Sequence, residues 1–523
     1  MLTAGFFAAD DRPSPRGLVE GLAQALGGEG PPAVRLDTGR LLILEAAAAG
    51  TAAEEARTSA RFDAADAELT LSRATFGPRP LYYRELAEGL AFSSRLAPLA
   101  RLQGTAPLRP AAVQELLELQ FTTGRETVFA DIFRVRPGES VRVRGGRIVG
   151  RGREAGALEE AVAPRSESEA IEAFDAALVE ALRLRIEAGG PGDLVTTGEV
   201  EGLALAVGLR RLSPGAGRVR LYSDAPRGAE ARGRLGRLGL LGAHVEAVTV
   251  TGELFWTVLP SVVAAIDDPA ADYFSVVLHL LATGAARGPG HIVSPVGANE
   301  LFAGYSRYRR NQRPSVLGGR ALRARGHLEG FRVLKEEDDH WRDGIAAAEI
   351  RLRSRPLTAL QRAQALDCGD WLVADVLNVH ERVFGAAGLA VSAPYLDERL
   401  ARLAFTLPDR LKVRGRHGKY LIRRWLERVA PDLEPFGPRA RPRIPIARLL
   451  AHEVGRIAPA LARSQALLAY CDAGAVASLC DRLARTGNRR AGIAVWVLVF
   501  FALWHAIHVE GKAPEGSVFD ILA

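Results

Sequence analysis

The N-terminal part of the chain, up to about residue 150, alternates between apolar and polar positions in short runs typical of β-strands. Two such runs are Arg40–Glu45 and Glu68–Ser72, and a period of two places successive side chains on opposite faces of a sheet. Further along, the pair Gly145-Gly146 separates the runs Ser140–Arg144 and Arg147–Val149. Paired glycines favour a tight hairpin turn, so we expect a β-rich N-terminal region.

The pattern changes beyond a polar linker at Arg151–Glu169. Apolar residues recur with a helical period over Ser168–Ile186, which predicts a long helix. Beyond it, short apolar runs alternate with helical segments such as Leu203–Leu212. The expected strands are Asp193–Val195, Val219–Ser223, Val245–Thr251 and Ile292-Val293. Strands that alternate with helices predict a parallel sheet with right-handed crossovers.

One apolar segment, Ala491–Val509, is nearly long enough to cross a membrane, for which about 20 residues are needed. It contains His505 and His508, and the sequence holds no second span of this kind. We therefore interpret the segment as a buried helix of a large domain and expect no membrane association.

The composition is that of a globular protein whose 523 residues suffice for two or more domains. Three scattered cysteines, Cys368, Cys471 and Cys480, are too few for a disulfide framework or a metal cluster. With no signal-peptide pattern at Met1–Asp10, we expect a cytoplasmic protein. The net charge of +7 comes from arginines spread along the chain without interleaved aromatic residues. This disfavours nucleic-acid binding but agrees with an acidic partner or substrate.

A strand, a tight turn and a helix start follow one another in His291–Tyr305, and open α/β sheets hold ligands at such strand ends. This segment resembles the S-G-E-G-A-D-E-L-F-G-G-Y motif of class B asparagine synthetases and of their relatives, the β-lactam synthetases and lasso-peptide cyclases. The matching residues are Gly297, Ala298, Glu300, Leu301, Phe302, Gly304 and Tyr305. Asn299 stands where the motif has a magnesium-binding aspartate.

The resemblance extends to the N-terminal region. Thr75–Tyr83 and Gly89–Ser94 resemble motifs of the glutaminase-type domain of asparagine synthetases, and Thr127–Gly138 resembles the end of that domain. The resemblance implies an α/β fold, with a glutaminase-like α/β sandwich of the Ntn type over residues 1–155. A parallel-sheet, ATP-pyrophosphatase-like synthetase domain with a helical C-terminal part would follow over residues 156–523.

Glutamine hydrolysis in this family requires a cysteine at position 2, which becomes the N-terminal nucleophile and uses its own α-amino group as base. This chain has Leu2, and its first cysteine is Cys368. We therefore expect no glutaminase activity, as in the β-lactam synthetases and lasso-peptide cyclases. If the protein forms an amide, the amine must come from a substrate rather than from ammonia.

Thr196–Gly202 occupies the position of the family's pyrophosphate loop, S-G-G-x-D-S. Such a loop binds phosphates with backbone N–H groups at a helix N-terminus and with hydroxyl donors, and its aspartate holds Mg²⁺. Hydroxyl donors and small residues persist here, and a serine follows the next expected strand. The nucleotide-binding candidates are Thr196, Thr197, Gly198, Ser223 and Gly297.

Both magnesium-binding aspartates of the family are replaced, one by Val200 and one by Asn299. Because a hard cation needs anionic oxygens, two interpretations are open. Either Glu201 or Glu199, together with Glu300, replaces the lost ligands and ATP with Mg²⁺ still binds, or the site is inactive. Glu199 and Glu201 also have a purely structural interpretation, since the helix dipole favours carboxylates at a helix N-terminus.

Asp267–Asp272 resembles the D-E-P-x-A-D segment on the substrate side of the family's site, which makes Asp268 and Asp272 substrate-side candidates. Asp-Pro pairs are also common turn formers, so a structural role is an equal alternative. Tyr305, at the end of the asparagine-synthetase-like motif, is the third candidate on this side.

Lysine is scarce in this arginine-rich chain and occurs only at positions 335, 412, 419 and 512. Lys419 lies in Gly418–Arg424, which matches the K-x-x-L-R helix start of the family. The resemblance implies that Lys419 neutralises the pyrophosphate and the charge that develops in adenylation and amide formation, a task suited to a compact ammonium group. Lys419 is therefore our catalytic candidate.

Two functions follow from the sequence. The first is a divergent amide ligase that adenylates a substrate carboxylate with ATP and lets an amine of the same or another substrate attack. The second is a catalytically silent relative that binds a peptide, a metabolite or an active paralogue. Carboxylates of Glu199, Glu201 or Glu300 directed into the cleft would favour the ligase. The same side chains turned to solvent, or Val200 packed in the place of magnesium, would favour the silent protein.

Overall fold

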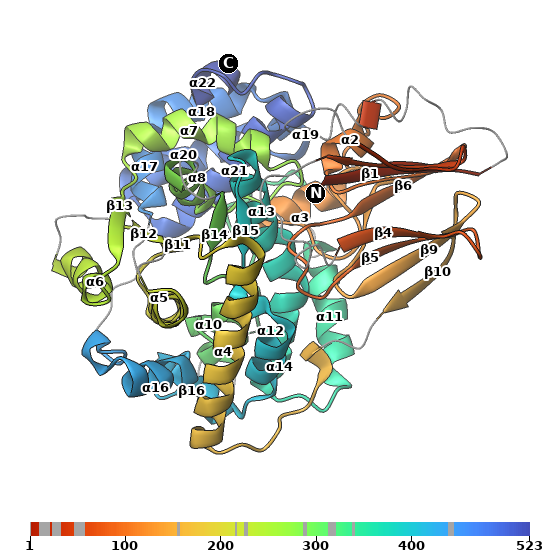
Figure 1. The fold of residues 1–523 in the computed structure, drawn as a ribbon. Helices are drawn as coiled ribbons and strands as arrows, with labels where there is room; N and C mark the ends of the chain where they lie inside the picture. The colour runs from red at the N-terminus through yellow and green to blue at the C-terminus, as the bar shows by residue number, and fades with distance from the viewer. Residues whose placement is uncertain are drawn as a thin grey trace.

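The computed structural model describes residues 2–9, 21–22, 33–46, 58–153, 157–214, 217–223, 229–285, 290–311, 321–336, 340–437 and 444–522. Two antiparallel sheets form its N-terminal part, and a parallel sheet with many helices forms the rest (Figure 1). This is the mixed α/β architecture expected from the sequence. The domain boundary at residue 155 stays a prediction.

The N-terminal part consists of one six-stranded and one four-stranded antiparallel sheet. The first has the order β2 (Ala33–Asp37), β3 (Leu41–Ala46), β1 (Leu2–Ala8), β7 (Gly89–Ser93), β6 (Tyr82–Leu86), β8 (Phe133–Arg134). The second has the order β10 (Arg147–Arg153), β9 (Glu139–Arg144), β5 (Glu68–Arg73), β4 (Thr58–Asp63). Gly145 and Gly146 join β9 to β10 with φ of 49° and 63°, the left-handed values of the expected hairpin turn.

Consecutive residues of the first sheet point into different cores, as the strand period requires. Phe7 packs between the two sheets with Leu69 and Val141 of the second sheet. Phe6 points the other way, into a core that also contains Leu116 and Trp504. The six-stranded sheet is therefore buried on both faces and attaches the N-terminal sandwich to the helical part.

The parallel sheet has the order β13 (His244–Val248), β12 (Arg218–Tyr222), β11 (Asp193–Thr196), β14 (His291–Val293), β15 (Ala390–Ser392). All neighbouring strands are parallel. The chain runs outward from β11 through β12 to β13 and then returns to β14 on the other side of β11. Ligands bind at such a reversal in open α/β sheets, so the loops after β11 and β14 mark the candidate site.

The helices and remaining short elements fill the space around this sheet. Their bounds are α2 (Leu96–Ala100), α3 (Pro110–Leu119), η1 (Ala157–Glu159), α4 (Glu167–Gly189), α5 (Val200–Leu212), α6 (Ala229–Leu240), α7 (Gly252–Ala265), α8 (Ser275–Ala285), α9 (Ala298–Leu301), α10 (Ser306–Asn311), η3 (His340–Arg342), α11 (Asp343–Arg353), α12 (Ala359–Leu366), η4 (Asp367–Val376), α13 (Leu377–Ala386), η5 (Pro394–Leu396), α14 (Glu398–Thr406), α15 (Asp409–Lys412), β16 (Val413–Arg414), β17 (His417–Gly418), α16 (Tyr420–Val429), η6 (Pro431–Leu433), α17 (Ile446–His452), α18 (Val454–Arg463), α19 (Gln465–Tyr470), α20 (Ala473–Thr486), α21 (Arg489–His508) and α22 (Val518–Leu522).

Three sequence expectations need correction. The strand expected at Val245–Thr251 ends at Val248, because the Thr251 side chain caps α7 by accepting from the backbone N–H of Leu254. Helix α5 begins at Val200 rather than at Leu203, so part of the expected loop is the first helical turn. Strand β15 was not expected, since Ala390-Val391-Ser392 contains only one β-branched aliphatic residue and lacks the apolar pair that indicated Ile292-Val293.

Helix α21 is long and apolar enough to cross a membrane by length and composition, but 89% of its most apolar window is buried inside the protein. The indole N–H of Trp496 donates to the Ala271 carbonyl at 2.6 Å, and that of Trp504 donates to the Ile266 carbonyl at 3.1 Å. These contacts support the interpretation of α21 as a core helix. No other helix in the described ranges meets the same criteria.

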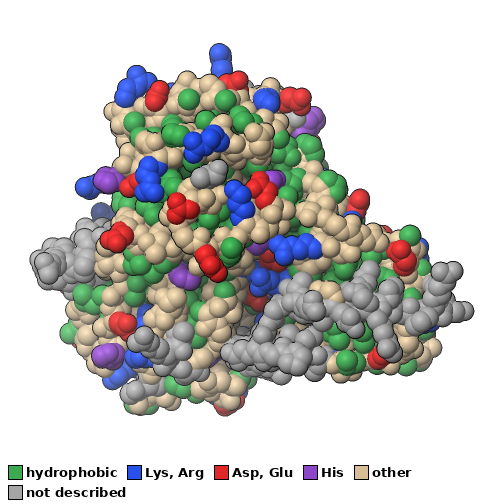
Figure 2. Space-filling model, turned by 90° about the horizontal axis from the view of Figure 1, so that it is seen from above, with side chains coloured by type: hydrophobic (Ala, Val, Ile, Leu, Met, Phe, Trp, Pro, Cys, Tyr) green, Lys and Arg blue, Asp and Glu red, His purple; other side chains and the backbone are tan. Residues whose placement is uncertain are grey.

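The surface charges are mixed on the face seen from above. Figure 2 shows Lys and Arg side chains interspersed with Asp and Glu side chains and with apolar patches. This distribution differs from the concentrated basic stripe of a nucleic-acid-binding face.

Candidate functional site

The loop after β11 has the shape of a phosphate-binding turn. Gly198 has φ of 75°, and its N–H donates to the Thr196 hydroxyl at 3.0 Å. Glu199 is the N-cap of α5, whose first turn contains Val200 and Glu201. A Cβ at Gly202 would lie 1.9 Å from the Thr196 hydroxyl, so glycine allows α5 to pack tightly against the end of β11.

The loop after β14 approaches the first loop because β11 and β14 are neighbours. Gly297 has φ of 90° and is the N-cap of α9. Gly304 lies so close to Asn299 and Lys419 that a Cβ there would be 2.3 Å from the Asn299 amide oxygen and 2.6 Å from Lys419 Cε. The glycines that match the family motif thus permit the close approach of three chain segments.

Lys419 is held by its backbone. It is the N-cap of α16 and has φ of 53°, a left-handed conformation that costs energy for any residue with a Cβ. Its N–H donates to the Phe302 carbonyl at 2.9 Å. The preceding Gly418 packs tightly against Ala303, because a Cβ added at Gly418 would lie 2.2 Å from the Ala303 carbonyl oxygen. The structure therefore brings Lys419 to the Gly297–Tyr305 segment and the β11 loop, as the sequence implied.

The ammonium group of Lys419 is already paired within the protein. Its Nζ lies 2.5 Å from a carboxylate oxygen of Glu201 and 3.5 Å from one of Glu199. The side chains of Lys419, Glu201 and Glu199 are 1%, 7% and 14% exposed. The two carboxylates thus point into the site, toward the lysine rather than toward solvent. We call these three residues the lysine triad.

This arrangement does not fit Mg²⁺-pyrophosphate. Val200 is 1% exposed and packs in an apolar cluster with Leu203 and Phe302, so it offers no oxygen. The carboxylates of Glu199 and Glu201, the residues on either side of Val200, lie against Lys419 and neutralise its charge instead of facing a metal ion. Among the described residues, no three His, Cys, Asp or Glu side chains are grouped as a metal site requires.

Glu300 and Tyr305 form a separate pair. Glu300 is 1% exposed, and the Tyr305 hydroxyl donates to its carboxylate at 2.8 Å. Burial raises the pKa of Glu300 above its usual range, although the Tyr305 hydrogen bond opposes this shift. Arg307 stacks over the Tyr305 ring at 4.0 Å. The proposed metal role of Glu201 with Glu300 stays a prediction, and each carboxylate has another partner here.

The other nucleotide-binding candidates lie where the sequence placed them, at strand ends. Ser223 directly follows β12, and its N–H donates to the Val248 carbonyl. Its buried hydroxyl has no hydrogen-bond partner among the described residues. Thr197 is half-buried between Thr196 and Gly198. Asp224, which completes the Tyr222–Asp224 segment, lies outside the described residues.

Asp268 connects the two parts of the chain. Arg134 of β8 binds both of its carboxylate oxygens, at 2.8 and 2.6 Å, and the Tyr82 hydroxyl donates at 2.8 Å. The neighbouring Asp267 pairs with the buried Arg382 at 3.0 Å. Burial opposes ionisation of Asp267, but Arg382 and Arg95 outweigh it and hold its pKa below the usual value. These contacts favour the structural alternative for the Asp-Asp-Pro segment.

Asp272, the other aspartate of this segment, lies close enough to Asp375 for their ionisation to be linked. Burial raises the pKa of Asp272 to about 6. Burial, and then the charge of Asp272, raises the pKa of Asp375 well above its usual value. The Trp371 indole donates to Asp375 at 2.6 Å. The substrate-side role of Asp272 and Tyr305 stays a prediction.

Sequence reasoning missed the residues that complete these pairs. Arg134 lies in the family-like segment Thr127–Gly138 and Arg382 lies in no such segment, and the partners of both are far away in the sequence. Arg382 lies in a helix of mixed composition, Leu377–Ala386, and the sequence does not show that this charged residue is buried. Such a residue needs a buried counter-charge.

Comparisons with known proteins agree with this geometry. Residues 227–506 match the asparagine synthase family, and residues 58–151 match a glutamine amidotransferase domain. A Mycobacterium tuberculosis protein named "Putative asparagine synthetase" of the glutamine-hydrolysing type is 25% identical over 503 residues, covering 86% of this chain and 76% of that protein. Bacillus subtilis asparagine synthetase 1, also glutamine-hydrolysing, is 21% identical over 485 residues, covering 85% and 76%. The chain therefore belongs to the asparagine synthase family, a group of ATP-dependent, amide-bond-forming ligases.

Proposed function

We propose that this chain is a glutaminase-less member of the asparagine synthase family whose nucleotide site is closed by the lysine triad. It would act by binding a peptide, a metabolite or an active paralogue rather than by adenylating a substrate. The observation that carries this proposal is the contact of 2.5 Å between Lys419 Nζ and the Glu201 carboxylate.

Electrostatics explains why the triad opposes a pyrophosphate. A phosphate that took Lys419 as its partner would withdraw the positive charge of this lysine from Glu201, 7% exposed, and from Glu199, 14% exposed. Both carboxylates would also lie beside the incoming anion. Removing one partner from a buried ion pair is strongly unfavourable, and like charges at short range add to that cost.

The N-terminal part supports the absence of glutamine hydrolysis. Leu2 begins β1 and pairs with Ala46 of β3, so an aliphatic side chain stands where the nucleophile is required. The three cysteines of the chain are free and buried in the synthetase part, at positions 368, 471 and 480. The sandwich would then serve as a scaffold attached through Asp267 and Asp268.

A second candidate is an amide ligase that uses a substrate amine, in the manner of the β-lactam synthetases and lasso-peptide cyclases. Two observations favour it: the carboxylates of Glu199 and Glu201 point into the site, and the loop geometry is kept. Gly198 and Gly297 keep left-handed conformations beside the N-termini of α5 and α9, and Lys419 is in place. In this candidate the lysine triad must open before ATP can bind.

Two assays on the purified full-length chain test the proposal. Release of pyrophosphate from ATP is measured with mixtures of carboxylate and amine substrates, and release of glutamate from glutamine is measured separately. We expect the wild type to match Lys419→Ala in the first assay and a buffer control in the second. Pyrophosphate release that exceeds Lys419→Ala would establish the ligase instead.

A further inference from the structure

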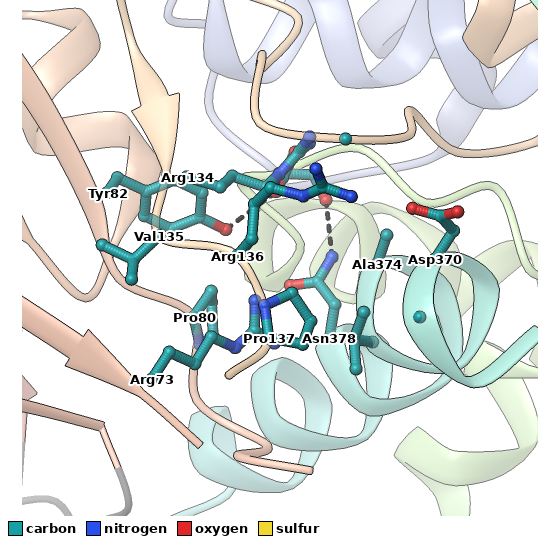
Figure 3. A pocket seen from close by; sticks show the side chains of 14 residues that line it. Arg73, Pro80, Tyr82, Arg134, Val135, Arg136, Pro137, Asp370, Ala374 and Asn378 are labelled. Carbon is teal, nitrogen blue, oxygen red and sulfur yellow. Dashed lines mark hydrogen bonds and ion pairs between the residues drawn. The ribbon is translucent and has the colours of Figure 1, made fainter. Parts of the chain in front are cut away.

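A cavity of about 230 Å³ lies between the N-terminal sandwich and the synthetase helices. Its walls include β10 and the segment around Arg136 on one side, and α11 and η4 on the other. A narrower extension, with about 20 Å³ of space, continues from Arg136 and Pro137 toward Asn378. Figure 3 shows this extension, which is lined by Arg73, Arg136 and Pro137 and by Ala374 and Asn378.

The cavity is strongly basic. Its lining includes five arginines, at positions 125, 136, 151, 153 and 351, but only two carboxylates, Glu139 and Glu159. Both carboxylates already have several partners. Glu139 contacts Arg125, lies 3.9 Å from Arg151 and accepts from the Arg136 backbone N–H at 2.8 Å. Glu159 lies 3.7 Å from Arg153 and 3.0 Å from Arg355, which is outside the cavity wall.

Two guanidinium groups therefore lack a direct counter-charge. In the part of the chain that the structure describes, no carboxylate forms an ion pair with Arg136 or Arg351. Burial, and then the positive charges of Arg136 and Arg153, lowers the pKa of Arg351. In addition, the buried Nε of Arg125 has no hydrogen-bond partner among the described residues.

Asp370, at the base of this region, compensates only in part. It is 7% exposed, and burial raises its pKa although Arg136, Arg323 and Arg351 favour its charged form. Arg323 is already paired with Asp367 at 2.7 Å, so this one carboxylate, which is costly to ionise, faces both Arg136 and Arg351. The local excess of positive charge is therefore built into the contact between the two parts of the chain.

We propose that this arginine cavity binds a small dianion with carboxylate or phosphate oxygens, held between Arg136 and Arg351. Guanidinium groups bind such oxygens in pairs and with charge assistance. The volume is below that of sites for drug-sized ligands, which restricts the ligand to a small metabolite or an inorganic anion. Because Arg136 follows the N-terminal sheet and Arg351 lies on α11, the anion joins the two parts of the chain. This site goes beyond the proposed function and does not depend on the lysine triad.

Calorimetry on the full-length chain at low ionic strength tests the proposal. Inorganic phosphate and succinate are titrated separately, and succinamide serves as an uncharged analogue of succinate. We expect saturable binding of at least one anion and none of succinamide. Binding of phosphate alone or of succinate alone identifies which oxygen chemistry the cavity prefers. No binding of either anion up to about 10 mM would overturn the proposal.

Variants locate the binding site. Arg136→Gln and Arg351→Gln are each expected to weaken the binding of the anion by about tenfold or more. Arg399 lies on α14 with its side chain 70% exposed, so Arg399→Gln should leave the affinity for the anion unchanged. Arg351 lies on an exposed helix face, so its variant keeps the test valid if Arg136→Gln does not fold. Lys419→Ala is expected to bind the anion as the wild type does. Equal binding by the wild type and Arg351→Gln, or loss of binding in Lys419→Ala, would contradict the assignment.

Discussion

The ammonium nitrogen of Lys419 lies 2.5 Å from the carboxylate of Glu201, and both side chains are buried. In a relative that binds pyrophosphate, the lysine at this position needs to be available to the anion. Here the loop that would present the phosphates supplies the counter-charge itself. In the proposed function, this pair accompanies Val200 and Asn299, which the family resemblance places at the magnesium-binding positions.

Glu201→Gln should destabilise the fold by about 3 kcal/mol, because breaking a buried ion pair leaves an uncompensated charge. Glu199, 3.5 Å from Lys419 Nζ, will retain part of the stabilisation. The free energy of unfolding is measured in urea. The matched control is Glu398→Gln, whose side chain is 56% exposed and pairs with Arg402, and it should change stability by less than about 0.5 kcal/mol. Equal effects of the two changes would show that the triad does not form.

Asp268→Asn should weaken the attachment of the N-terminal sandwich, since Arg134 and Tyr82 both bind this carboxylate. We expect a loss of about 3 kcal/mol in the free energy of unfolding. Glu126→Gln removes an exposed partner of Arg109, with the Glu126 side chain 56% exposed, and should have little effect. A change as small as that of Glu126→Gln would argue against the buried contact.

Asp272 should make stability depend on pH in the acidic range. Its pKa of about 6 in the folded protein exceeds the usual value near 4 of an exposed aspartate. Between these values the folded state binds more protons than the unfolded state, so stability falls as the pH rises from about 4 to about 6. Asp272→Asn should remove part of this slope in urea unfolding at several pH values. An unchanged slope in the variant would assign the pH dependence to other groups.

Gly202→Ala should destabilise the protein by about 2 kcal/mol, because the added Cβ would lie 1.9 Å from the Thr196 hydroxyl. Gly236, in α6, offers the matched comparison because nothing lies within 4 Å of its Cβ position. Gly236→Ala should therefore stabilise the helix by about 0.5–1 kcal/mol. Thermal unfolding of both variants measures the difference. The same sign for both changes would contradict the tight packing at the β11 loop.

The sequence could predict the α/β fold because strand and helix periods are local properties. The strands at Glu68–Arg73 and Asp193–Thr196 were expected nearly at their observed bounds. Strand β15 was not predicted because Ala390-Val391-Ser392 has a single β-branched aliphatic residue. The position of Lys419 was implied by a family motif rather than by periodicity.

The pairings at the site could not be predicted in the same way. Glu201 lies in the first turn of α5 and Lys419 precedes α16, and only the packing of the whole chain brings them together. From the sequence alone, Glu201 could be a metal ligand or a solvated carboxylate at a helix N-terminus, and an ion pair with Lys419 was not foreseen. The contact between Arg134 and Asp268 could not be predicted for the same reason. The sequence around each residue does not indicate a counter-charge 134 residues away.

The most direct test of the account is calorimetric titration of the full-length chain with ATP and Mg²⁺, with Lys419→Ala beside it. Because the lysine triad opposes an incoming pyrophosphate, we expect no saturable binding by the wild type at about millimolar nucleotide. Magnesium-dependent, saturable binding by the wild type that is weakened in Lys419→Ala would contradict the account and establish a working nucleotide site.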